Sequence, residues 1–292
     1  MKRLFLAAAC LGAMLLLPTS AAIAAPHNPT GEYAQFNDCP LSRASLELCV
    51  FSESSEGFFT IGTKTVPLKT PQILQGGLEF EESLFEGDLP LFAAEDGNTL
   101  PPTPQPVPGG LLGVTAPKWW PQFLQDLFNE TINNGFTGVT ATVELAAPAS
   151  SVKLNAANLL GATGTALTLP IKVKLGNPFL GNNCYIGSNS NPINLKFTSG
   201  TTSPPPPNEP ISGDPGEFEF NEAETIITLS GGRLVDNSFA SPGAKGCGGL
   251  FAFLIDPFVN SILGVPSAAG KNTAVLEGVI KLGDPAAVKA SE

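Results

Sequence analysis

Apolar and polar side chains alternate most clearly along residues 167–175. One parity is apolar and the other is mostly polar: Leu167, Leu169, Ile171, Val173 and Leu175 against Thr168, Pro170, Lys172 and Lys174. Because side chains of a strand point to opposite faces in turn, this segment is predicted to be a half-buried strand. Pro170 cannot donate a ladder hydrogen bond, so we expect it at a sheet edge or a bulge.

A second alternating segment, residues 193–197, follows after a loop that carries Cys184. Two such strands predict a long-loop hairpin or neighbouring strands of a sandwich. Further strands are expected near residues 58–66, 73–80, 139–145, 218–220, 226–229 and 276–282. We expect a bulge at Gly76-Gly77, and an end to the strand at Gly231-Gly232.

Two helices are predicted. Apolar residues from Trp120 to Phe128 follow the i, i+3, i+4, i+7 spacing, with Pro117 and Pro121 suited to a first turn and Asn134-Gly135 to a stop. Trp120 is expected to head the buried stripe of this helix. A second, short helix is expected with Asp256 as its N-cap, Pro257 at its first position and Gly264 after its end.

Many short strands with Gly and Pro between them favour a mainly β fold over βαβ units. We therefore expect a β-sandwich or barrel-like arrangement of antiparallel sheets with one or two short amphipathic helices. Residues 25–95 form an N-terminal region that is either separate or part of the main domain. Residues 96–110 are a Pro/Gly-rich linker or loop, and residues 111–292 form the β-rich domain.

The first 24 residues have the pattern of a secretory signal peptide. Lys2 and Arg3 precede an apolar stretch at residues 4–17, and Ala22-Ile23-Ala24 is a small-residue cleavage site. A lipid-modified start at Cys10 is disfavoured because Ala7, three residues earlier, is not a large aliphatic side chain. No further membrane span is expected, since Asp256-Pro257 interrupts the apolar residues 250–263.

Net charge and cysteines limit the possible partners and the compartment. A formal charge of −11 disfavours nucleic acids and anionic membrane surfaces. Cys39, Cys49, Cys184 and Cys247 remain after signal removal, and export makes two disulfides the default. Of the three possible pairings we favour Cys39–Cys49, which are close in sequence, and therefore Cys184–Cys247. Zinc is disfavoured because no CxxC pairs occur.

The catalytic patterns that most hydrolases need are missing. His27 is the single histidine and lies beside the cleavage point, which argues against Ser-His-Asp and Cys-His catalysis. Carboxylates are the remaining resource, with Glu79, Glu81, Glu144 and Asp256 as candidates for glycoside hydrolysis. A solvated strand face and a helix cap explain these residues more simply.

Two further segments could bind a ligand. Trp119 and Trp120 could form a sugar-stacking or membrane-contact surface, although burial of a helix stripe is the simpler interpretation. Residues 95–98, Glu-Asp-Gly-Asn, could supply oxygens to Ca²⁺, but turn chemistry explains them equally well. Most aromatic residues are Phe, 19 in all, which suits a core or an apolar ligand pocket.

Three segments together resemble a family of exported proteins of actinobacterial type that carries no assigned activity. They are residues 31–41, residues 184–207 with their four-proline close, and residues 234–249 with the Gly-Cys-Gly-Gly end. The resemblance implies secretion and implies that the four cysteines belong to the family pattern. The resemblance implies no catalytic residue in this chain.

These features predict a secreted, non-enzymatic protein, either wall-associated or released, that acts as an envelope component or binding module. A carrier of an apolar ligand is the first alternative, and a carboxylate-based hydrolase acting on glycans is the second. The expected partner is an envelope component, a glycan or an apolar ligand, and no cofactor is expected.

Overall fold

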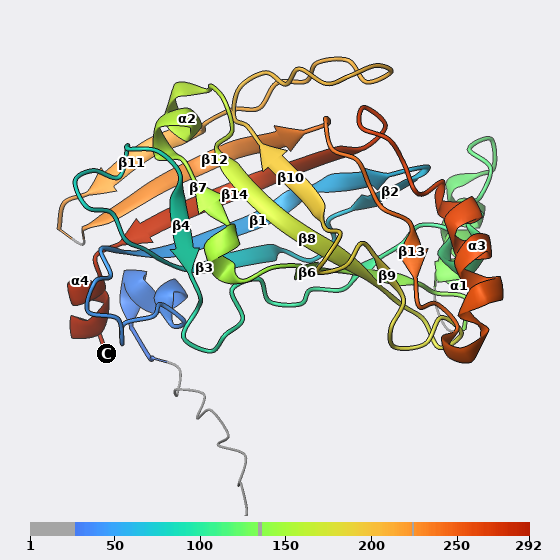
Figure 1. The fold of residues 1–292 in the computed structure, drawn as a ribbon, viewed down its shortest axis with the longest axis horizontal. Helices are drawn as coiled ribbons and strands as arrows, with labels where there is room; N and C mark the ends of the chain where they lie inside the picture. The colour runs from blue at the N-terminus through green and yellow to red at the C-terminus, as the bar shows by residue number, and fades with distance from the viewer. Residues whose placement is uncertain (1–26, 134–135, 224) are drawn as a thin grey trace, which may run out of the picture.

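The computed structural model of the chain describes residues 27–292 apart from residues 134–135 and 224. The expected signal peptide and the Asn134-Gly135 helix stop lie outside the described residues. Within the described chain the fold is mainly β, with antiparallel strands and few short helices, as the sequence predicts (Figure 1).

One layer of the sheet contains the longest strands. In spatial order it consists of β11 (Glu217–Asn221), β12 (Ile226–Asp236), β14 (Thr273–Gly283), β1 (Leu48–Ile61) and β3 (Gln72–Leu78), with β2 (Lys64–Pro67) paired to the end of β1. The first long strand of the chain therefore lies between the last strand and β3. Cys49 faces Gly283, and Thr60 faces Thr273.

The second layer crosses in front of the first in Figure 1. It consists of β4 (Leu89–Phe92), β7 (Lys153–Leu154), β8 (Leu167–Gly176), β6 (Thr140–Leu145) and β5 (Gln105–Pro106), with β10 (Ile193–Phe197), β9 (Tyr185–Ile186) and β13 (Ala244–Lys245) joined to it. Strand β4 pairs with both β3 and β7, so the hydrogen-bonded sheet continues from one layer into the other.

Polar contacts also join the layers elsewhere. Thr198 and Val235 exchange backbone hydrogen bonds of 3.0 and 2.9 Å just past the end of β10. On the other side, the buried amide of Gln105 accepts from the N–H groups of Lys69 and Thr70 and donates to the Thr70 carbonyl. The result is a flattened, barrel-like sandwich.

The core lies between the two layers. The apolar parity of β8 is buried as predicted, and it packs with Leu195 and Phe197 of β10 against Val50 and Leu276 of the other layer. Strands β8 and β10 pair antiparallel, so the segment around Cys184 is the expected long-loop hairpin.

Three local expectations are wrong. Pro170 lies inside β8 rather than at an edge. Its carbonyl accepts from the Ala146 N–H. The proline lacks an N–H, but no ladder hydrogen bond is lost because β8 changes partner from β7 to β6 at this residue. Gly76-Gly77 pairs in regular register with β1, and a side chain at Gly76 would collide with the Phe92 carbonyl. Strand β12 continues past Gly231-Gly232 with a register shift between Leu229 and Gly232.

The helices and turns cover the two ends. The α-helices are α1 (Gln122–Asn133), α2 (Ala156–Gly161), α3 (Ala252–Leu263) and α4 (Pro285–Ala290), and the 3₁₀ turns are η1 (Gly31–Phe36), η2 (Gly110–Leu112), η3 (Ala149–Ser151) and η4 (Gly249–Phe251). Figure 1 shows α1 and α3 at one end of the molecule and α4 at the other, beside the N-terminal turn.

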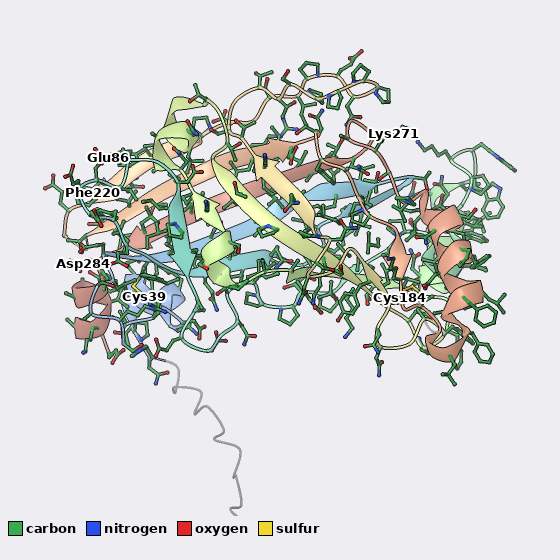
Figure 2. All side chains as sticks on the ribbon, viewed as in Figure 1. Cys39, Glu86, Cys184, Phe220, Lys271 and Asp284 are labelled. Atoms are coloured by element: carbon green, nitrogen blue, oxygen red, sulfur yellow. A yellow bond between two sulfur atoms is a disulfide. The ribbon has the colours of Figure 1, made fainter. Side chains whose placement is uncertain are left out.

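The two disulfides lie at these opposite ends, where Figure 2 labels Cys39 and Cys184. Cys39 bonds to Cys49 with a Cα–Cα distance of 5.4 Å, and Cys184 bonds to Cys247 with a Cα–Cα distance of 4.1 Å. This is the pairing favoured from the sequence. All four cysteines are buried.

A buried asparagine connects several loops near the α3 end of the long strands. Asn272 is fully buried, and its Oδ1 accepts from the Gly62 N–H at 2.9 Å and from the Ser267 hydroxyl at 2.6 Å. Its Nδ2 donates to the carbonyls of Phe239 and Ala268. One side chain therefore satisfies polar groups of three separate loops.

Candidate functional site

An apolar cavity lies between the two layers at the end covered by α3. Its volume is about 80 Å³, of the same order as an engineered apolar cavity of about 150 Å³ that binds benzene. The first layer contributes Phe59, Ile61 and Val66, and the second contributes Val143, Val173 and Ile186. Because its volume is about half of that value, it suits a few carbons of one alkyl chain.

Helix α3 covers one end of the cavity. Phe258, Val259 and Ile262 line the cavity from this helix. Val259 is buried, whereas Phe258 is 52 % exposed. Phe258 is the one lining residue that is exposed, so we assign the mouth of the cavity to this residue.

Both polar side chains of the lining are already hydrogen-bonded to the protein backbone. Lys64 and Gln105 are the lining residues with polar side chains. The Lys64 ammonium donates to the Gly113 carbonyl at 2.8 Å, and the Gln105 amide bonds to the Lys69–Thr70 backbone. The cavity can therefore select a ligand by shape and apolar contact, while a polar head group would have to stay outside.

Helix α3 is held both near its middle and at its C-terminal end. The Asp256 carboxylate accepts from the N–H groups of Gly246 and Cys247 at 3.2 and 2.8 Å, which ties the helix to the Cys184–Cys247 disulfide. At its C-terminal end, the Thr63 N–H donates to the Leu263 carbonyl at 2.8 Å. The β1–β2 turn and the disulfide loop thus hold α3 over the cavity.

The expected start of this helix is wrong. Helix α3 begins at Ala252, so Asp256 lies inside it and Pro257 is an interior proline. Asp256 is not an N-cap because its carboxylate is used by the Gly246–Cys247 backbone. The expected end is confirmed: Gly264 has a left-handed φ of 66° and donates to the Asn260 carbonyl.

The tryptophan pair lies outside the cavity lining. Trp119 is 82 % exposed, and Trp120 is half-buried with its ring edge-on to Phe128 at 5.7 Å between centroids. Trp120 precedes α1 instead of standing in its first turn, and no described side chain of α1 is buried. The expectation of a buried stripe is therefore wrong.

The apolar stripe of α1 instead faces solvent together with that of α3. Trp119, Phe123 and Leu127 are exposed near α1, and Leu250, Phe253 and Leu254 are exposed on η4 and α3. We call these six residues the apolar end. Phe136 and Phe179, both exposed and 6.2 Å apart between ring centroids, lie on segments between the two helices.

The carboxylate candidates do not gather at the cavity. Glu79 and Glu81 are exposed beyond the end of β3. Glu144 accepts from the Tyr185 hydroxyl and lies 3.7 Å from the Lys172 ammonium. None of the four candidates is a lining residue of the cavity.

The Glu95–Asn98 segment forms a turn. The Asp96 carboxylate accepts from both the backbone and the side-chain N–H of Asn98, each at 2.7 Å. In the part of the chain that the structure describes, no group of three or more His, Cys, Asp or Glu residues could hold a metal ion. Local turn bonds thus account for Asp96.

Asp38 lies close to this turn and has a raised pKa. Burial raises the pKa of the Asp38 carboxyl above its ordinary 3.8, and the Asp96 charge raises it further, against hydrogen bonds from Gln75 and Asn37 that lower it. The folded chain thus holds this proton to a higher pH than the unfolded chain. The contribution of Asp38 to stability is full below pH 3.8 and is lost as the pH rises through the folded pKa.

We therefore expect Asp38→Asn to gain stability relative to the wild type as the pH rises from below 3.8 to neutrality. Denaturant unfolding of both proteins across this range measures the difference. Asp96→Asn is the matched control, and it should lower the pKa of Asp38 without removing its titration. A stability difference that stays flat with pH would contradict the assignment.

The cavity residues carry a sequence signal, but only in part. Val139, Ala141 and Val143 lie on the apolar parity predicted for β6, and Val173 and Leu175 on that of β8. The alternation shows which face is inward. It does not show where two inward faces fail to meet, because that depends on residues far apart in sequence.

Comparison of the chain with family models, with curated proteins and with solved structures finds no match. Separately, no helix among residues 27–292, outside the two gaps, is both long and apolar enough to cross a membrane.

Proposed function

We propose that this protein is an exported carrier that binds an apolar molecule in the cavity beneath α3. The observation that carries the proposal is a cavity whose lining is aliphatic and aromatic, with both of its polar side chains already bonded to backbone. Known ligand sites are mostly apolar, with a few polar groups that fix orientation. Here the polar groups are engaged, which favours a ligand with an apolar tail.

A binding role agrees with the distribution of chemistry in the described chain. No carboxylate lines the cavity, and the Asp256 carboxylate, the one candidate that lies on α3, is used in holding this helix. The ligand is therefore expected to leave unchanged. The resemblance to exported proteins and the two disulfides support an extracytoplasmic site of action.

Titration with a fluorescent fatty acid tests the proposal. We expect saturable binding by the wild type and at least about tenfold weaker binding by Val143→Phe, a difference of about 1.4 kcal/mol. Val143 is buried in the lining, so the larger ring would occupy the void. Native mass spectrometry of the protein after mild purification would identify a co-purified ligand.

Val114→Phe is the matched control, because it adds the same ring at a position that is half exposed and outside the lining. It should bind the fatty acid like the wild type. Absence of saturable binding by the wild type, or equal binding by Val143→Phe, would refute the carrier function.

A further inference from the structure

The apolar end is continuous with the mouth of the cavity. The loop before α1 contacts α3, since the Cα of Gly113 lies close enough to Ile262 that an added Cβ would be 2.9 Å from its Cγ2. On the other side, the Asn177 amide donates to the Phe136 carbonyl, and Gly248 donates to the Leu180 carbonyl. These bonds connect the end of α1, through residues 136 and 177–180, to η4 and α3.

Charge is sparse on the α3 side of this surface, whereas Lys118, Asp126 and Glu130 are exposed on the α1 side. Residues 178–183 contain no charged side chain, and residues 246–264 contain one, Asp256, whose carboxylate is bonded to two backbone N–H groups. In the whole chain 14 % of residues are charged. The α3 side is therefore complementary to an uncharged, apolar partner, and the net charge of −11 disfavours an anionic one.

The exposed side chains protrude. Leu250 is 94 % exposed, Trp119 82 % and Phe253 73 %. A rigid protein partner would need a matching pocket for each of them, whereas a fluid lipid layer closes around them. Helices α1 and α3 have 12 residues each, fewer than the about 20 that span a bilayer. Helices of this kind lie in the lipid interface, where Trp is also enriched.

We propose that the apolar end is a docking surface for a zwitterionic lipid layer. On docking, the side chains of Leu250 and Phe253 enter the acyl region, and Trp119 lies at the level of the head groups. If the proposed carrier function holds, docking also places the cavity mouth at Phe258 against the lipid, so that an apolar ligand moves without crossing water. The docking itself does not depend on cavity loading.

Flotation with phosphatidylcholine vesicles tests this docking. We expect the wild-type protein to float with the vesicles and the double variant Leu250→Asp, Phe253→Asp to lose at least about tenfold in bound fraction. Both residues are so exposed that the fold should tolerate the change. Emission from Trp119 and Trp120, the only tryptophans in the chain, should shift to the blue on docking.

The matched control is Phe218→Asp, Phe220→Asp. These residues are 55 % and 49 % exposed on the edge strand β11, at the end of the molecule away from α3, where Figure 2 labels Phe220. This variant should float like the wild type. Val143→Phe should also float while losing the fatty acid, which separates failure of docking from failure of the carrier function.

Three outcomes would overturn the docking proposal. They are no flotation of the wild type, equal flotation of the Leu250/Phe253 variant, or tighter binding when anionic lipid replaces part of the phosphatidylcholine. A concentration-dependent dimer in sedimentation that the Leu250/Phe253 variant abolishes, without vesicle binding, would show instead that a second copy of the chain covers this surface.

Discussion

Replacing Cys184 and Cys247 together by alanine is expected to lower the free energy of unfolding by about 4 kcal/mol. The bond closes a loop with a sequence separation of 63 residues, and its loss frees that loop in the unfolded chain. The variant should also bind the fluorescent fatty acid more weakly, because the bond holds the Gly246–Cys247 backbone to which Asp256 of α3 is tied.

Guanidinium unfolding of the oxidised proteins measures the first effect, and fatty acid titration measures the second. The pair Cys39→Ala, Cys49→Ala is the matched control: its separation of 10 residues predicts a loss of about 3 kcal/mol. This second bond lies at the other end of the sheet, so its loss should leave ligand binding intact. Equal loss of binding in both variants would mean that α3 is not held by the Cys184–Cys247 bond in particular.

Asn272→Ala is expected to lower the free energy of unfolding by roughly 3 to 5 kcal/mol. The side chain is fully buried and makes four hydrogen bonds, of which those to the Ser267 hydroxyl and the Phe239 carbonyl are buried and those to Gly62 and Ala268 are partly buried. Its removal leaves the Gly62 N–H and the Phe239 carbonyl without this partner, and a buried group left unsatisfied costs about 1–3 kcal/mol.

Asn194→Ala provides the comparison for Asn272. Asn194 lies in β10 with an exposed side chain, so the same chemical change should alter stability by less than about 0.5 kcal/mol. Unfolding by urea, with Tm as a second readout, measures both variants. A similar small loss for the two would show that water replaces the Asn272 bonds at no net cost.

Much of the β structure could be predicted because alternation is a local property. The apolar parity of β8 and β6 correctly identified their inward faces, and the expectation of export, together with the spacing of the four cysteines, predicted both disulfides. Pro170 misled because proline excludes only its own N–H from the ladder. Pro170 lies where β8 changes from one partner strand to the next, so no N–H is needed there, and the spacing of the sequence cannot reveal this.

The candidate site could be predicted only in part. An apolar helix stripe at i, i+3, i+4 and i+7 has the same pattern whether a core or an external partner covers it. The sequence therefore could not predict that Phe123 and Leu127 are exposed. Asp256-Pro257 has the pattern of a helix start, yet the Gly246–Cys247 backbone takes the carboxylate. Tertiary hydrogen bonds outweighed the local preference in this case.

The position of β1 between β14 and β3 has a consequence for the order of folding. Residues 49–60 of β1 pair with residues 273–283 of β14, so the centre of the first layer is formed by strands that are more than 200 residues apart in sequence. A nascent polypeptide without its last strand would leave both β1 and β12 as open edges. Pairings this distant slow folding, commonly to milliseconds or seconds. The chain therefore completes its native sheet only after synthesis of β14, and until then the unpaired edges of β1 and β12 are open to non-native strand pairing.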